Sequence, residues 1–241
     1  MANISKFLAE LIGTFALCFV GAGAICIATM QDAGYAGLVG VAAAHGLILS
    51  IGVSAAMNVS GGHLNPAVTF AMLVTRRINL TDAIQYVIAQ CVGGVAAGVL
   101  ILFIFKGMQT PGGAQVLEAC SIGTPKFDAG LISAPTAALV EIAMTFLLIY
   151  AVFGTAVDPR APKIGGWGIG LTVGACIFLG GPLTGAALNP ARCFGTGIVA
   201  ALSQNHADFW AQQWVYWVGP LAGGAIAGMI YHNLILEKKG S

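Results

Sequence analysis

The sequence contains the tripeptide Asn-Pro-Ala twice, and each copy opens an apolar segment. The copies consist of Asn65, Pro66 and Ala67, and of Asn189, Pro190 and Ala191. Asn is a favoured helix N-cap and Pro is favoured at the first helical position, so each copy predicts a helix start. A capping Asn accepts backbone N–H groups through its side-chain oxygen and can still donate through its NH₂ group. This chemistry suits the binding of a small polar molecule.

The composition places both tripeptides in an integral membrane protein. Of 241 residues, 58% are hydrophobic and 8% are charged, whereas soluble domains carry roughly 25% charged residues. The net charge is +1 and the ten Lys and Arg are scattered, which argues against a nucleic-acid partner, because that needs a clustered basic face. Glu10 interrupts the first apolar run and no clear small-residue cleavage site follows, so we expect this run to remain as a membrane span.

Six stretches are long enough to cross a bilayer as helices, which takes about 20 apolar residues. They are residues 4–28, 37–57, 82–105, 134–157, 164–181 and 210–236. The segments that the tripeptides open, near 65–75 and 189–201, are about half that length and predict re-entrant half-helices. Non-helical backbone at membrane depth persists only when it is buried in protein or lines a watery cavity. We therefore expect a cavity where the half-helices begin.

The distribution of basic residues predicts the orientation. With six spans, both termini lie on one side, and that side carries Lys6, Arg76, Arg77, Arg160, Lys163, Lys238 and Lys239. The other side carries Lys106 and Lys126, together with the acidic Asp32, Glu118, Asp128 and Asp208. The positive-inside rule therefore places both termini in the cytoplasm, for a multi-pass protein of the cell membrane. Residues 156–163, between the fourth and fifth spans, form a charged turn, and a gate is the alternative.

Two pairs of segments reveal an internal repeat. AELIGTF at 9–15 resembles VEIAMTF at 140–146, and YVIAQCVGGVAAG at 86–98 resembles YWVGPLAGGAIAG at 216–228. The offsets are 131 and 130 residues, and the two tripeptides lie 124 residues apart. The chain therefore contains two copies of one plan: span, span, half-helix, span.

The repeat divides the chain into residues 1–106, an extracellular linker at 107–133 that is rich in Gly, Pro and polar residues, and residues 134–241. Because each copy has an odd number of full spans, the second must enter the membrane in the opposite orientation. Inverted repeats of this kind place a binding or conduction site at the mid-membrane junction. Two half-helix N-termini that meet there carry partial positive charge and repel cations, protons included.

Over essentially its whole length the chain resembles the aquaporins, the major intrinsic protein family. The resemblance implies an all-α membrane protein of six tilted helices and two half-helices around one pore per subunit, assembled as a homotetramer. Its partners would be water, small neutral solutes and membrane lipid, and no cofactor or metal is expected. A water molecule held by both asparagine NH₂ groups must point its hydrogens along the pore, which breaks a proton wire.

The resemblance also implies an outer constriction of four residues, located here by spacing. They are His45, Ile177, Ala186 and Arg192. The first lies twenty residues before Asn65, and the others lie twelve before, three before and three after Asn189. A charge at membrane depth is functional by default, and a snorkelling or ion-paired side chain is the alternative for Arg192. For His45 the alternative is a satisfied core residue.

Three further residues are assigned by their positions. His63, two residues before Asn65, is expected to line the cytoplasmic half of the pore, with a loop-stabilising hydrogen bond as the alternative. Glu10 and Glu141 occupy equivalent repeat positions and resemble the buried glutamates that hold the family's re-entrant loops. Their expected role is structural rather than catalytic.

The constriction is similar to that of the plant tonoplast intrinsic proteins, which conduct water and in several cases ammonia, urea or hydrogen peroxide. It places His in the second span and apolar Ile177 and Ala186 on the other walls. The glycerol branch of the family has Asp directly after the motif Arg, where this chain has Cys193. We expect water to be the main solute, and a glycerol or urea facilitator is the alternative.

Two other functional classes fit less well. A secondary transporter also uses inverted repeats and broken helices, but coupling usually needs titratable or ion-coordinating groups near the midplane, where this sequence offers mainly Asn. An enzyme needs a nucleophile with a positioned base, and no such set is present. The cysteines in apolar or half-apolar segments form no C-x-x-C pair, so we interpret them as packing residues, with a redox or metal role as the alternative. They are Cys18, Cys26, Cys91, Cys176 and Cys193.

Overall fold

The computed structural model describes residues 2–31, 37–204 and 208–236. Within these ranges the chain is helical, apart from turns, loops and one isolated bridge between Gln109 and Gln115. The prediction of an all-α protein is confirmed. Asp32, Lys238 and Lys239, which entered the orientation argument, lie outside the described residues.

The helices follow the plan that the repeat predicts. The long helices are α1 (Ala2–Met30), α2 (Gly37–Ser60), α4 (Leu80–Phe105), α6 (Ala134–Val152), α7 (Trp167–Thr184) and α9 (Asp208–Ile230). The short helices are α3 (Pro66–Val74) and α8 (Pro190–Gln204), and single π-helical turns, η2 (Phe153–Val157) and η3 (Tyr231–Ile235), extend α6 and α9. Among the described residues, α1, α2, α4, α7 and α6 with its π turn are long and apolar enough to cross a membrane. The 23-residue α9 is long enough as well, but it begins with the more polar DFWAQQW.

The linker between the two halves contains a short helix that the sequence analysis did not anticipate. This helix, α5 (Val116–Cys120), is followed by a 3₁₀ turn, η1 (Ser121–Gly123). Val116 and Leu117 are buried, so the linker packs onto the bundle rather than projecting from it. Both segments lie against α1.

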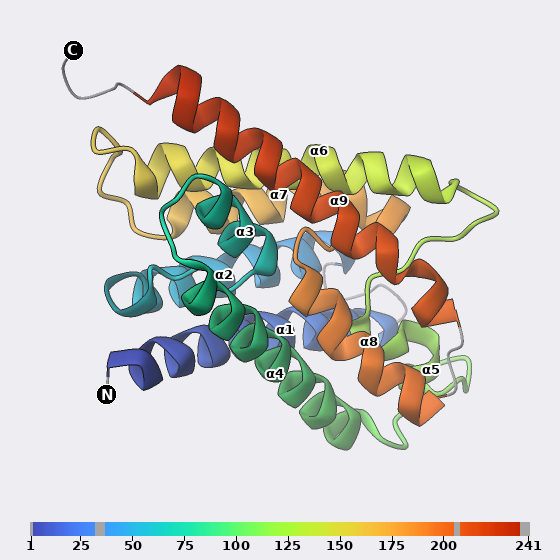
Figure 1. The fold of residues 1–241 in the computed structure, drawn as a ribbon. Coiled ribbons are helices and arrows are strands. Elements are labelled where there is room, and N and C mark those ends of the chain that lie inside the picture. The colour runs from blue at the N-terminus through green and yellow to red at the C-terminus, as the bar shows by residue number, and fades with distance from the viewer. Residues whose placement is uncertain (1, 32–36, 205–207, 237–241) are drawn as a thin grey trace, which may run out of the picture.

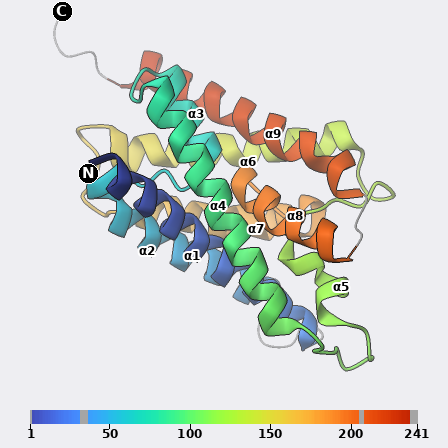
Figure 2. The same ribbon diagram turned by 60° about the horizontal axis from the view of Figure 1, so that its bottom comes forward.

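The two halves of the chain pack in equivalent ways. Helix α1 contacts α2 and α4, and α6 likewise contacts α7 and α9. Each short helix packs mainly against the other half, α3 against α9 and α8 against α4, while α2 and α7 join the halves at the centre. Figures 1 and 2 show that α1 begins and α9 ends at one end of the bundle, with α5 at the opposite end.

Glycines allow the closest helix contacts. A side chain at Gly195 of α8 would overlap the backbone of Gly94 in α4, and one at Gly170 of α7 would overlap the backbone of Gly46 in α2. In lipid the hydrophobic effect does not hold helices together, so close van der Waals packing between small residues takes its place. These glycines therefore set the distance at which the short helix α8 and the central pair α2–α7 are held.

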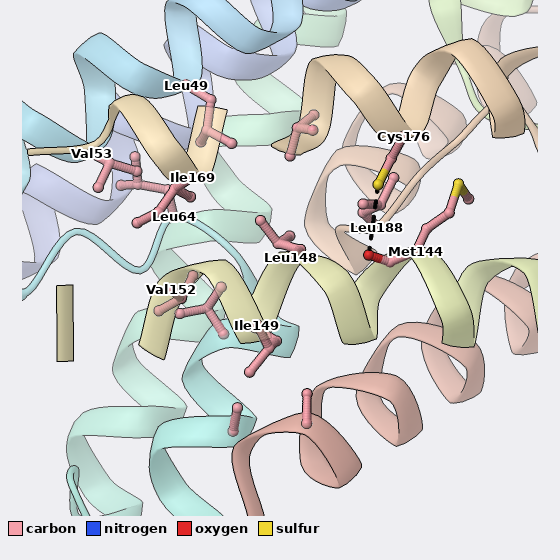
Figure 3. Packing of buried hydrophobic residues seen from close by; sticks show 14 of the residues in the cluster. Leu49, Val53, Leu64, Met144, Leu148, Ile149, Val152, Ile169, Cys176 and Leu188 are labelled. Atoms are coloured by element: carbon pink, nitrogen blue, oxygen red, sulfur yellow. Dashed lines mark hydrogen bonds between the residues drawn. The ribbon is translucent and has the colours of Figure 1, made fainter. Parts of the chain in front are cut away.

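A buried apolar cluster surrounds the non-helical segments that precede the half-helices (Figure 3). Most of its members come from α2, α6, α7 and both loops, and α1, α3 and α9 contribute others. They include Leu49, Val53, Leu64, Leu148, Val152, Ile169 and Leu188. Leu64 and Leu188, which directly precede the two tripeptide asparagines, are 0% and 1% exposed. These two side chains anchor the loops in the interior, so the asparagines beside them have fixed positions.

Candidate pore

The two asparagines cross-link the non-helical segments of the two halves. Nδ2 of Asn65 donates to the carbonyl oxygen of Leu188 at 2.9 Å, and Nδ2 of Asn189 donates to that of Leu64 at 2.8 Å. Each Oδ1 accepts a backbone N–H from the first turn of its own helix, at 2.8 and 3.0 Å. An amide NH₂ group has two hydrogens, so each asparagine keeps one donor beyond the crossed bond.

Unusual backbone conformations precede both asparagines. Leu64 and Leu188 have left-handed φ angles of 51° and 52°, and Ala186 has a φ of 45°. Non-glycine residues adopt this region at a cost, and they keep it only where surrounding structure imposes it. Here the conformation turns each leucine carbonyl toward the asparagine of the opposite half.

Glu10 of α1 holds the first loop in this conformation. Its Oε1 accepts hydrogen bonds from the Ser60 hydroxyl at 2.6 Å and the His63 backbone N–H at 2.9 Å. Its Oε2 accepts from the Leu64 backbone N–H at 2.6 Å and from Nε2 of Gln90 at 2.7 Å. Buried backbone N–H groups need partners, and this fully buried carboxylate supplies them.

Glu141 of α6 plays the equivalent part in the second half. It accepts hydrogen bonds from the Thr184 hydroxyl at 2.6 Å and from the backbone N–H groups of Ala187 and Leu188 at 3.0 and 2.8 Å. Tyr86 and Tyr216 complete the equivalence, because their hydroxyls donate to the carbonyls of Ser60 and Thr184 at 2.7 and 2.8 Å.

The crossed asparagines line an internal cavity of about 260 Å³. Its polar lining comprises His45, His63, Asn65, Asn189 and Arg192. Most of the remaining wall is aliphatic and includes Leu17, Leu49, Val53, Leu148, Val152, Ile169 and Val173. The polar side chains therefore stand at a few places along a wall that is otherwise mostly aliphatic.

Arg192 lines this cavity and is 2% exposed. Its Nε donates to Nε2 of His45 at 3.1 Å, and its Nη1 donates to the carbonyl of Ala186 at 3.3 Å. Nδ1 of His45 lies 2.8 Å from the carbonyl oxygen of Val41. Since Nδ1 must donate there and Nε2 must accept, these partners assign the neutral tautomer with the proton on Nδ1.

Arg192 also lines a second cavity, of about 740 Å³, on the side of the bundle where α5 lies. We call it the outer cavity and the cavity that the asparagines line the inner cavity. Ile177, Lys126 and Cys120 line the outer cavity, and Arg192 belongs to the walls of both cavities. The four residues chosen by spacing are therefore distributed over a junction: His45, Ala186 and Arg192 line the inner cavity, and Ile177 lines the outer one.

His63 occupies the corresponding position at the other end. It lines both the inner cavity and a third cavity of about 550 Å³ that Lys6, Arg76 and Arg77 also line. Its Nδ1 lies 3.1 Å from Oγ1 of Thr69. The residue thus lines two cavities and also makes the hydrogen bond that was the alternative, while its place in the cytoplasmic half of a pore stays a prediction.

Several groups of this site were not predicted from the sequence. The carbonyls of Leu64 and Leu188 accept the crossed bonds, and Gln90 joins Glu10 to Thr69, at 2.7 and 3.1 Å. Backbone carbonyls carry no residue-type signal, so no motif points to the leucines. Gln90 lies within the repeated segment 86–98, where a polar residue in an apolar run was an available signal.

Spanning-length helices around a cavity lined by buried polar groups define a membrane channel for small solutes. The chain matches the family Major intrinsic protein over residues 1–231 and belongs to it. Its members are membrane channels and not enzymes, as the sequence analysis predicted.

Relatives and a solved structure agree with this assignment. The chain is 42% identical over 246 residues to Aquaporin TIP4-4 of Zea mays and 41% identical over 243 residues to Probable aquaporin TIP2-2 of Arabidopsis thaliana. Each alignment covers 98% of this chain and 89% of the relative. The X-ray structure of the aquaglyceroporin from Plasmodium falciparum superposes with a TM-score of 0.81 over 97% of both chains, at 23% identity. The predicted fold of six spans and two re-entrant half-helices is confirmed.

Proposed function

We propose that the chain forms a passive pore for water that also admits ammonia, hydrogen peroxide or other small neutral solutes and excludes protons and ions. The observation that carries this proposal is the crossed pair of asparagines at the start of two opposed half-helices. Each asparagine lines the inner cavity and has one amide hydrogen beyond its bond to the opposite loop. The cavity therefore offers two fixed donors at one place.

Two fixed donors exclude protons for a geometric reason. A water molecule that accepts from both asparagines uses its lone pairs on them, and its own hydrogens point up and down the pore. It cannot accept a proton from the next water while it is held this way. The N-termini of α3 and α8 add about half a positive charge each, which disfavours any cation at the same place.

The junction of the inner and outer cavities is the proposed selectivity filter, formed by His45, Ile177, Ala186 and Arg192. The Arg192 charge repels cations, and the carbonyl of Ala186 and the ring of His45 fix its position. Ile177 and Ala186 give the filter apolar walls, so a solute finds few polar partners there. Such a filter favours small neutral molecules with one or two hydrogen-bonding groups.

A glycerol or urea facilitator is the second candidate. The Plasmodium falciparum relative is an aquaglyceroporin, but at 23% identity it supports the fold alone. Against this candidate, Cys193 stands where the glycerol branch has Asp, and it is fully buried with its thiol 3.7 Å from the Pro125 carbonyl oxygen. The more similar relatives are named aquaporins.

We also propose how the chain is divided into repeats, how it assembles and how it lies in the membrane. The first repeat comprises residues 1–106 and the inverted second repeat residues 134–241, joined by the linker 107–133. The exposed apolar residues on several spans support contact with lipid and with neighbouring subunits of a homotetramer; they include Ile12, Ile51, Leu171, Phe178 and Val218. We place the protein in the cell membrane with both termini in the cytoplasm.

Stopped-flow measurements on the reconstituted protein test the proposal. Liposomes without any ion or proton gradient are exposed to osmotic steps of an impermeant solute, glycerol or urea, and to ammonia. We expect rapid shrinkage and internal alkalinisation by ammonia, both faster than in empty liposomes, whereas glycerol should enter much more slowly than water. Water flux no faster than in empty liposomes would refute the water channel, and solute flux that needs an ion gradient would indicate a coupled transporter.

Two further measurements address organisation. Light scattering coupled to size-exclusion chromatography gives the mass of the assembly and distinguishes a tetramer from a monomer. Protease protection of tags at the two termini in sealed cells or vesicles reports the side on which the termini lie. Tags that extracellular protease removes from intact cells would overturn the orientation.

A further inference from the structure

Two of the six cysteines face each other where the linker packs on the first span. Sγ of Cys26, in α1, lies 3.2 Å from Sγ of Cys120, the last residue of α5, and the two residues are 94 positions apart. Both are buried. A disulfide has an S–S distance of about 2.05 Å, so the two sulfurs need to approach by only roughly 1 Å to form a bond.

The backbone around Cys120 holds the pair in place. Ser121 and Ile122 both have left-handed φ angles, 49° and 56°, and Gly123 follows with a φ of 69°. A Cβ at Gly123 would lie 2.6 Å from the Cβ of Ala22 in α1, so this turn contacts α1 as closely as a glycine permits. Two consecutive non-glycine residues with positive φ are held only by surrounding contacts, so the position of Cys120 against α1 is fixed.

The two thiols differ in access. Cys120 is 7% exposed and lines the outer cavity of about 740 Å³, which Arg192 also lines, whereas Cys26 is 0% exposed. The hydrogen bond with Cys26 lowers the pKa of the Cys120 thiol; burial opposes this, and the backbone at Gly123 and Ile122 assists it. Cys120 is therefore the thiol that a small oxidant in the outer cavity reaches first. The lowered pKa also favours its thiolate, which is the reactive form of cysteine.

The other four cysteines lack such a partner. The thiols of Cys176 and Cys193 lie 3.8 and 3.7 Å from the backbone carbonyl oxygens of Met144 and Pro125. Within the described residues, which include all six cysteines, Cys26 and Cys120 are the only pair with their sulfurs in contact. Packing in the interior accounts for the other four cysteines, but it does not account for the contact between the sulfurs of Cys26 and Cys120.

We infer that Cys26 and Cys120 form a redox site in which a peroxide converts the two thiols into a reversible disulfide. The Cys120 thiolate attacks one oxygen of hydrogen peroxide, the O–O bond breaks, and the products are a sulfenic acid and hydroxide, which takes a proton to become water. The Cys26 sulfur then attacks the sulfenic sulfur, the S–O bond breaks, and a second water leaves with the Cys26 proton. Two thiols lose two electrons, which one peroxide gains, and a dithiol reductant reverses the reaction.

The bond would connect the linker covalently to the first span beside the outer mouth of the pore. It closes a loop of about 94 residues, and cross-links over long loops restrict the unfolded chain most strongly. Oxidation is therefore expected to raise the thermal stability of the protein and to hold the linker over the outer cavity. The disulfide would restrain the linker and not the pore wall, so this inference does not depend on which solutes the pore conducts.

Mass spectrometry of the full-length wild-type protein tests the inference directly. The purified protein is treated with hydrogen peroxide, denatured, alkylated with N-ethylmaleimide and digested without reductant. We expect a cross-linked peptide pair that contains Cys26 and Cys120, its loss after dithiothreitol, and a rise in Tm of roughly 5 °C or more on oxidation. Full alkylation of both thiols after peroxide, or Cys120 oxidised to a sulfinic acid beside a free Cys26, would overturn it.

Three variants assign the effect to the pair. Cys26→Ala and Cys120→Ala should each abolish the peroxide-induced rise in Tm, and Cys91→Ala, which removes a thiol from α4, should retain it. A rise that survives in Cys26→Ala or Cys120→Ala would show that oxidation stabilises the protein elsewhere and would refute the site.

Discussion

Nε of Arg192 donates a hydrogen bond to Nε2 of His45 at 3.1 Å, across 147 residues of sequence. The bond makes His45 an acceptor, and the 2.8 Å contact between its Nδ1 and the Val41 carbonyl uses the only ring hydrogen. A second proton on the ring would place a positive charge beside the guanidinium, and the two charges would repel each other. Among the described residues no carboxylate lies within ion-pairing distance of Arg192, so the guanidinium has no direct ion-pair partner at the junction of the two cavities.

The first prediction concerns this charge. Arg192→Val removes the guanidinium and leaves Nε2 of His45 without its donor, so the junction widens and its positive potential falls. We expect glycerol and urea fluxes in liposomes to rise several-fold while water flux persists. The conservative Arg192→Lys keeps the charge, loses the bond to His45, and should change solute size selectivity more than cation exclusion. A correctly assembled Arg192→Val protein with the selectivity of the parent would place the filter elsewhere.

The second prediction concerns proton exclusion at the crossed asparagines. Replacing Asn65 or Asn189 with Asp puts a carboxylate where two donors are needed, and its charge partly offsets the positive N-termini of α3 and α8. We expect proton or cation leakage above that of the wild type, measured with an internal pH dye under an imposed potential. Asn→Ser at the same positions, which keeps a small capping side chain without charge, is the control. Asp variants that fold, conduct water and stay proton-tight would contradict the mechanism.

The third prediction concerns the glutamates that hold the loops. Glu141→Gln replaces one acceptor oxygen by an NH₂ group, which then faces a hydroxyl or backbone N–H that needs an acceptor. Leaving a buried donor unpaired costs about 1–3 kcal/mol, so Tm should fall by roughly 5 °C. Glu10→Gln should behave alike, because Glu10 accepts from two backbone N–H groups as well. Scanning fluorimetry on detergent-solubilised protein measures both, and unchanged Tm values would show that the carboxylates are dispensable.

Sequence signals located the half-helices well because these signals are local. Asn65 caps α3 through a side-chain bond to the Ala67 N–H, as Asn-Pro at a helix start predicts. Glu10 and Glu141 were likewise found because the repeat marks equivalent positions. The cap is a local contact that needs no knowledge of the packing. The glutamates bond to residues 50 and 43 positions away, so their expected role came from the family resemblance.

Contacts between segments that are far apart in the chain could not be predicted from the sequence. The bond between Arg192 and His45 depends on how α8 lies against α2, and the approach of Cys26 to Cys120 depends on α5, a helix of five residues in a stretch rich in turn-forming residues. No fixed spacing between residues in the sequence predicts either contact. The placement of Ile177 on the outer cavity also depends on how α7 is rotated about its axis.

The fourth prediction concerns pH and the turn between α6 and α7. Side-chain and backbone hydrogen bonds from Arg160 hold the pKa of Asp158 well below its usual range, and the Tyr231 hydroxyl assists at 3.2 Å. Because the folded-state pKa is depressed, the stabilisation is complete above the unfolded pKa of about 4 and is lost as pH falls below it.

Asp158→Asn should therefore lower Tm at pH 7, and the difference from the wild type should narrow as the pH falls from 5 to 3. Tyr231→Phe removes one hydrogen bond but leaves the ion pair of Asp158 and Arg160, at 2.7 Å, in place. It should retain most of the pH dependence. A Tm difference between Asp158→Asn and wild type that stays constant over this range would contradict the assignment.

The final prediction concerns ammonia and the apolar wall at Ile177. The family resemblance implies a His at this place in the water-specific branch, whereas Ile177 offers no hydrogen-bond partner to a passing solute. The junction should therefore be wider than one with a His at this place. The free-energy cost of desolvating ammonia should also be smaller there, because ammonia can still form hydrogen bonds with His45 and Arg192. We expect wild-type liposomes to alkalinise faster than empty ones in an ammonia gradient, at a pH that supplies free ammonia.

Ile177→His would place a second imidazole at the junction, which narrows the opening and adds a polar group that favours water. Ammonia flux should then fall by a larger factor than water flux, while Ile177→Leu, of similar volume and without a polar group, should leave the ratio of the two fluxes close to that of the wild type. The two fluxes are compared in the same liposomes, with a pH dye for ammonia and light scattering for water. If wild-type liposomes shrink rapidly under osmotic shock but alkalinise no faster than empty ones, the apolar wall does not broaden the filter, and the pore selects water in spite of Ile177.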